Sequence, residues 1–87
     1  MDINDWRIRI DELNDELIAL LNKRASFAVE IGKIKKQKGL PVLDAGREQA
    51  VLNLVAEKAA KAGGPLSPES FKNIFRVIID ETCKVEE

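Results

Sequence analysis

The sequence predicts an all-α fold of three helices, the first of them very long, and three observations support this prediction. Apolar residues recur at spacings of three and four from Trp6 to Ile34, which is the pattern of one helix face. Helix-ending glycine and proline residues follow this segment and separate two shorter periodic segments behind it. No strand pattern competes with these three segments. The chain of 87 residues is expected to form one domain, residues 1–87.

The first helix is expected from about Asn4 to about Lys38, because Gly39 can cap it and Pro41 cannot continue it. At 1.5 Å per residue this helix would be roughly 50 Å long, far longer than a compact domain of this mass is wide. Two shorter helices of the same chain cannot cover it. We therefore expect an intertwined homodimer, in which a second copy covers much of the apolar face.

Two shorter helices are expected after a brief extended loop at residues 40–43. The second helix should follow its N-cap Asp44 and end near Ala62, where a Gly-Gly-Pro sequence begins. The third should begin at Pro68, with Ser67 as its N-cap. Its apolar stripe consists of Phe71, Ile74, Phe75, Ile78, Ile79 and Thr82.

Composition excludes several classes of function. Fourteen basic residues against 15 acidic residues offer no electrostatic surface for nucleic acid or for an anionic membrane. We find neither an apolar run of the signal-peptide type nor a stretch of about 20 apolar residues, so a cytoplasmic protein is expected. Without histidine, the single Cys83 cannot complete a usual zinc site or a Cys-His nucleophile. We interpret it as a half-buried helix residue.

Arg24 stands in the apolar face of the first helix, where an apolar residue is expected. A buried arginine keeps its charge and needs an anionic partner or a wet cavity. Lys35 follows 11 residues later, within about 20° around the helix and roughly 16 Å along it. The two cations could bind a small dianion above Ala28. The alternative is an ion pair inside the bundle between Arg24 and a carboxylate such as Glu48.

Other polar residues gather at the ends of the second and third helices. Asp44, Arg47 and Glu48 lie at a helix N-terminus, which can bind hydroxyls and anions together. Ordinary first-turn charge is the alternative. Thr82 and Glu86 are neighbours one turn apart that continue the apolar stripe of the third helix. For Glu86 the alternative is exposed charge at a frayed helix end.

Arg7 lies 17 residues before Arg24, roughly 25 Å away along a straight helix, and cannot serve the same site within one chain. An antiparallel partner helix would bring the Arg7 of one protomer toward the second half of the other. The alternative is that Arg7 is a surface residue.

Together these residues resemble the all-helical class of chorismate mutase. The resemblance covers nearly the whole chain and rests on three segments, WRIRIDELNDELIALLNKRASFAVEIGKIK, PVLDAGREQAVL and FRVIIDET. It implies an enzyme, an isomerase that converts chorismate to prephenate in aromatic amino acid biosynthesis. It also implies a homodimer of three-helix protomers with two active sites, and no metal, organic cofactor or covalent intermediate.

The resemblance implies a role for each candidate residue. Arg24 and Arg7, the latter donated across the dimer interface, would bind carboxylates. Lys35 would contact a carboxylate and the ether oxygen. Glu86 stands where glutamine, the second donor to the ether oxygen, occurs in the bacterial pattern, so it can donate only when protonated.

At the other end of the site, the resemblance assigns the ring hydroxyl to Glu48 and to the backbone of Asp44. Arg47 would support that end, and Thr82 would replace a serine common at its position. Two other functions remain open, an isochorismate pyruvate-lyase of the same fold and a non-catalytic helical dimerisation module. The assignment of Glu48 to a hydroxyl favours the mutase over the lyase.

Overall fold

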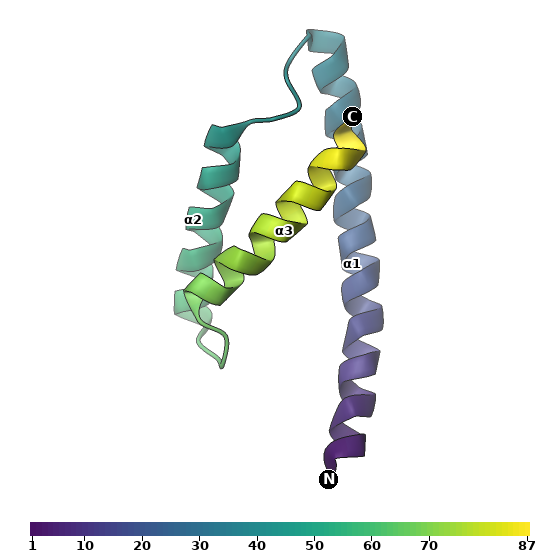
Figure 1. Ribbon diagram of the computed structural model, residues 1–87, viewed down its shortest axis with the longest axis vertical. Helices are drawn as coiled ribbons and strands as arrows, with labels where there is room; N and C mark the ends of the chain where they lie inside the picture. The colour runs from purple at the N-terminus through teal and green to yellow at the C-terminus, as the bar shows by residue number, and fades with distance from the viewer.

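The computed structural model describes all 87 residues as three α-helices in chain order, α1 (Ile3–Lys38), α2 (Ala45–Ala62) and α3 (Pro68–Glu86). The molecule measures 54 × 25 × 15 Å, and α1 runs along its longest dimension (Figure 1). No residue is in a strand. The predicted all-α class and the order of one long and two shorter helices are confirmed.

The ends of α1 are set by local hydrogen bonds. Asp2 and Asp5 form a capping box in which each carboxylate accepts from the backbone N–H of the other, at 3.0 Å. Gly39 ends the helix in the left-handed conformation at φ 67°, where a side chain would be strained. The predicted start at about Asn4 is one residue late, because Asp2 is the N-cap.

The shorter helices begin at the predicted caps. The Asp44 side chain accepts from the backbone N–H of Arg47 at 2.9 Å, and the Ser67 hydroxyl accepts from that of Ser70 at 3.0 Å. Gly63, at φ 70°, follows the last residue of α2. These caps define where α2 and α3 begin through local hydrogen bonds alone.

Helix α3 crosses diagonally between the other two and packs on both, whereas α1 and α2 do not contact each other (Figure 1). The buried apolar residues are few and lie along these two contacts. They are Ala28, Leu52, Ala59 and Ile79. None of the helices is both long and apolar enough to cross a membrane. The C-terminal end of α3 lies against the second half of α1, which brings residues distant in sequence together.

The N-terminal part of α1 is exposed along its whole length. Every residue from 1 to 23 is exposed, including Trp6, Leu13 and Leu17, each with more than half of its surface accessible at 53%, 56% and 54%. Isolated exposed apolar residues are common, but a continuous row of large ones is typical of an interaction surface. The predicted homodimer would cover this row and remains a prediction.

Candidate active site

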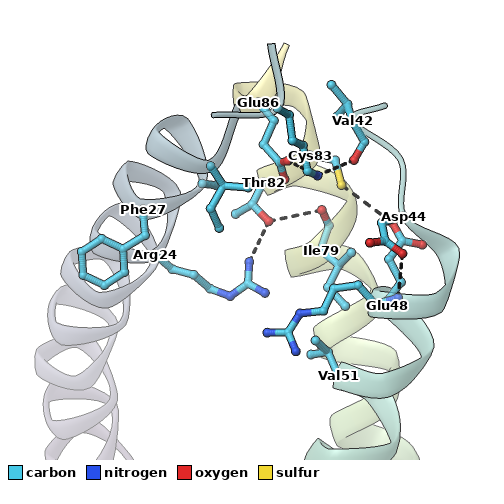
Figure 2. Close-up of a pocket in the computed structure, with 14 residues that line it drawn as sticks. Arg24, Phe27, Val42, Asp44, Glu48, Val51, Ile79, Thr82, Cys83 and Glu86 are labelled. Carbon is cyan, nitrogen blue, oxygen red and sulfur yellow. Dashed lines mark hydrogen bonds and ion pairs between the residues drawn. The ribbon is translucent and has the colours of Figure 1, made fainter. Parts of the chain in front are cut away.

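A cavity of about 430 Å³ lies between the second half of α1, the start of α2 and the end of α3 (Figure 2). Half of its lining residues are apolar. All of the predicted site residues except Arg7 line it. They are Arg24, Lys35, Asp44, Arg47, Glu48, Thr82 and Glu86. A concave, partly apolar pocket with a few convergent polar groups is the usual form of a small-molecule site.

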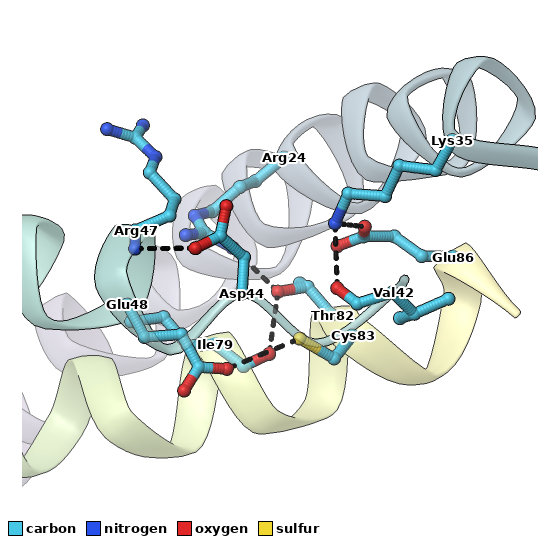
Figure 3. A network of polar contacts seen from close by, with 10 residues as sticks. All are labelled: Arg24, Lys35, Val42, Asp44, Arg47, Glu48, Ile79, Thr82, Cys83 and Glu86. Atoms are coloured by element: carbon cyan, nitrogen blue, oxygen red, sulfur yellow. Dashed lines mark hydrogen bonds and ion pairs between the residues drawn. The ribbon is translucent and has the colours of Figure 1, made fainter. Parts of the chain in front are cut away.

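Lys35 and Glu86 meet at one end of the cavity (Figure 3). The Lys35 Nζ donates to Glu86 Oε1 at 2.5 Å and to the backbone carbonyl of Val42 at 2.7 Å. Only 17% of the Lys35 side chain and 11% of the Glu86 side chain are exposed. Glu86 lies in the last turn of α3. Because its side chain is largely buried and contacts Lys35, the alternative of exposed charge at a frayed end is wrong.

Arg24 reaches across the cavity to α3 (Figure 2). Its Nη1 donates to the Thr82 hydroxyl at 2.7 Å, and that hydroxyl donates in turn to the carbonyl of Ile78 at 2.7 Å. Arg24 forms no ion pair, so the alternative of a pair with Glu48 is wrong. A guanidinium carries five N–H donors, and this arrangement fixes one of its ends while leaving other donors for an anion.

The N-terminus of α2 supplies the opposite side of the cavity. The Asp44 carbonyl accepts from the N–H of Glu48 at 3.0 Å, whereas the Asp44 N–H donates to no group in the chain. The Glu48 carboxylate faces α3, and the Arg47 guanidinium extends away from Asp44 and Glu48 (Figure 3). This side of the cavity thus offers a backbone N–H donor and a carboxylate acceptor, a combination that suits a hydroxyl group.

Cys83 is a cavity residue that the sequence interpretation missed. It is half-buried, as predicted, but its thiol also lies 3.7 Å from Glu48 Oε1, to which it donates. Burial raises the pKa of the Cys83 thiol, and the negative charges of Glu86 and Glu48 raise it further. The thiol therefore stays protonated and helps to hold the Glu48 carboxylate. Its position one turn before Glu86 was the available signal.

The sequence interpretation also missed Val42, because only its backbone takes part. Residues 40–43 were interpreted as a connecting loop, but the Val42 carbonyl accepts from Lys35 and holds its ammonium group over the cavity. A backbone acceptor in a loop leaves no mark in the residue types.

The described chain has no group of three or more His, Cys, Asp or Glu side chains that could hold a metal ion. The cavity combines Arg24, Lys35 and Arg47 with Asp44, Glu48 and Glu86. Arg24 and Lys35 lie on the α1 side, and the Asp44–Glu48 turn, which includes Arg47, lies on the α2 side (Figure 3). The arrangement suits a small ligand with anionic groups and a hydroxyl.

Arg7 lies on the exposed first half of α1 and is absent from the cavity. Within one chain, Arg7 cannot contact a ligand in this cavity. Its binding of a carboxylate across the interface of a homodimer remains a prediction.

The family model for chorismate mutase type II matches residues 6–87. The chain belongs to the type II chorismate mutase family. The predicted resemblance is confirmed. Among solved structures, a chorismate mutase (form II) from Thermus thermophilus is similar at a TM-score of 0.89 and 28% identity, over 97% of this chain and 92% of that one.

Two relatives add to this comparison. The T-protein of Haemophilus influenzae is 36% identical over 80 residues, which cover 92% of this chain and 21% of that protein. The 4-amino-4-deoxychorismate mutase of Streptomyces venezuelae is 32% identical over 81 residues, which cover 93% of this chain and 77% of that protein. The chain thus corresponds to about a fifth of the T-protein and to most of the Streptomyces enzyme.

Proposed function

We propose that this chorismate mutase family member converts chorismate to prephenate in aromatic amino acid biosynthesis. One observation carries the proposal, namely that Arg24 and Lys35 on α1 share one cavity with Glu48 on α2 and Glu86 on α3. Chorismate carries two carboxylates, a ring hydroxyl and an ether oxygen, and each finds a complementary group there. The cytoplasmic location expected from the sequence is part of this proposal.

The reaction is a pericyclic rearrangement. A C–O bond breaks while a C–C bond forms in one concerted step, and no proton needs to move. The protein contributes by holding the compact reactive conformer, in which the two reacting carbons are close. Arg24 and Lys35 bind carboxylates on one side of the ligand. Arg24 can do so in one fixed orientation, because Thr82 holds one end of its guanidinium at 2.7 Å. We therefore assign Thr82 a role that acts through Arg24.

Negative charge develops on the ether oxygen as the C–O bond breaks. Lys35 donates to this oxygen from one side, and a protonated Glu86 donates from the other. In the structure, these two groups contact each other directly. The ether oxygen would enter between them. A preorganised donor of this kind contributes about 3 to 4 kcal/mol of transition-state stabilisation.

The ring hydroxyl is held at the start of α2. It accepts from the Asp44 N–H and donates to the Glu48 carboxylate, while the Cys83 thiol holds the other side of that carboxylate at 3.7 Å. Arg47 supports this end of the site through its charge.

A homodimer completes the site in this proposal. The exposed apolar row on the first half of α1 is covered by the second copy, and Arg7 of one protomer joins the Arg24 and Lys35 of the other. The substrate then has a cation for each carboxylate, and each dimer holds two equivalent sites.

The proposal is tested by incubating the protein with chorismate, following the loss of its ultraviolet absorbance, and identifying the product. Prephenate as the product supports the mutase. Isochorismate and 4-amino-4-deoxychorismate are offered in parallel, with Lys35→Ala as the control for background decay. Release of pyruvate from isochorismate alone would assign the lyase function, and three unchanged substrates would assign a non-catalytic module.

A further inference from the structure

Gly32 lies in the interior of α1 at the point where the last turn of α3 touches it. It is one of the few buried residues of the chain. A Cβ atom added to Gly32 would lie 2.5 Å from the carbonyl oxygen of Glu86, 2.7 Å from its Cα and 3.0 Å from its carbonyl carbon. All three are backbone atoms, so no side-chain rotation could make room. Any side chain at position 32 must move the end of α3.

The backbone conformation does not require glycine at this position. The glycines with positive φ are Gly39, Gly63 and Gly64, and Gly32 is not among them. In a regular helix, glycine is less favourable than alanine, because its backbone loses more conformational freedom on folding. The gain that offsets this cost is the close approach of the Glu86 backbone to α1.

This approach also places the Glu86 side chain. Lys35 lies three residues after Gly32 and therefore on the same side of α1. With the Glu86 Cα seated on Gly32, the Glu86 carboxylate comes to 2.5 Å from the Lys35 Nζ. Buried Ala28, one turn before Gly32, extends the narrow face on which α3 rests.

We propose that Gly32 is a positioning residue of the active site: the absence of a side chain seats the Glu86 backbone on α1 and thereby sets the Glu86 carboxyl group opposite Lys35. The catalytic consequence of this proposal depends on the proposed mutase function, whereas the geometric part does not. A methyl group at position 32 lifts only the final turn of α3. The Arg24–Thr82 contact one turn earlier stays in place.

The test is Gly32→Ala, read first without any substrate. Nuclear magnetic resonance of the ¹³C-labelled Glu86 carboxyl group reports the contact with Lys35. In the parent, Lys35→Ala shifts the Glu86 carboxyl signal, because the ammonium group beside it is lost. In Gly32→Ala, the Glu86 signal should already be shifted, and adding Lys35→Ala should change it little. Gly46→Ala is the matched control, because a Cβ there meets nothing closer than Asp44 Oδ1 at an ordinary 3.6 Å.

The second reading is kinetic. Displacement of a catalytic group by about 1 Å costs about a hundredfold in rate, so Gly32→Ala should lower kcat by that order while KM changes by less than about threefold. Combined with Glu86→Ala, the same substitution should cost little more, because the group that it displaces is already gone.

Several outcomes would overturn the proposal. The first is a Glu86 signal in Gly32→Ala that responds to Lys35→Ala as fully as in the parent. The second is that Gly32→Ala lowers kcat equally in the parent and in Glu86→Ala. The third is that Gly32→Ala does not fold, as judged by circular dichroism. The last would show that Gly32 serves the whole fold. The two proposals fail separately. A parent inactive on chorismate defeats the mutase function but leaves the resonance test of Gly32 intact, and an unchanged Glu86 contact defeats only the role of Gly32.

Discussion

The two halves of α1 belong to one continuous helix with one apolar periodicity, but they have different surroundings. In the second half, Ala28 and Gly32 are buried beneath α3. In the first half, the corresponding face carries Trp6, Leu13 and Leu17, and all residues up to 23 are exposed. Small side chains let a helix of the same chain approach closely, whereas large apolar side chains leave a surface for another partner. The small buried residues mark where α3 packs on α1, whereas the large exposed residues of the first half belong to the surface predicted to build the dimer.

The largest expected effect comes from a substitution in the first half of α1, at the predicted dimer interface. Leu17→Asp would place a charge in the predicted interface, where an unpaired buried charge costs several kcal/mol. We expect dissociation of the dimer at micromolar concentration and loss of more than about 99% of activity. Sedimentation measures the dissociation, and the chorismate assay measures the loss of activity. Ala60→Asp, at an exposed position of α2, is the control and should remain dimeric. A parent that sediments as a folded, active monomer would refute the dimer and the role of Arg7.

The next prediction joins the two halves across two chains. Arg7→Ala and Lys35→Ala should each remove nearly all activity when made alone. After subunit exchange, a mixed dimer has one site with both residues intact and one with neither, so an equimolar mixture should recover about a quarter of the parent activity. Subunit exchange is verified by mass labelling. If exchange is complete and no activity returns, Arg7 does not act across the interface.

A smaller effect is expected where Glu86 of α3 faces the second half of α1 in the cavity. Glu86 donates to the ether oxygen only when it carries a proton, so the activity of the parent should fall as pH rises. Glu86→Gln keeps nearly the same shape and supplies a donor at every pH. Rate profiles from acid to alkaline pH should therefore diverge, with the variant retaining activity where the parent declines. Superimposed profiles would show that Glu86 is not the donor.

The smallest expected effect concerns Cys83. Burial, together with Glu86 and Glu48, raises the pKa of its thiol in the folded chain above the ordinary value of roughly 8.5. The folded state thus binds this proton more tightly than the unfolded state does. Its contribution to stability is complete below the ordinary pKa and declines as pH rises through the raised one.

Urea unfolding at several pH values above about 8 measures this effect. Cys83→Val removes the titrating group and should lose less stability over that range than the parent does. Equal losses in the two proteins would remove the thiol from the explanation. Cys83→Val should also test whether the thiol holds Glu48, because its loss frees that carboxylate at every pH.

The sequence by itself determined the helices and one face of the site. The side chains of Asp44 and Ser67 cap the helices that follow them, and Gly39 ends the first. These are local interactions, so residue type and order suffice to predict them. The alignment of Arg24 with Lys35 was equally predictable, because the helix repeat fixes it.

Only the tertiary structure decided which groups those two cations contact. Arg24 meets Thr82 across 58 positions of sequence, and Lys35 meets Glu86 across 51. Both contacts depend on the crossing of α3 over α1, and at Gly32 the Glu86 backbone comes closest to α1. The Val42 carbonyl enters the site through a loop conformation, and Cys83 enters through the rotation of α3 about its axis. Helix periodicity fixes the relations within an element, but the angle and depth at which two elements pack depend on side-chain volumes from both.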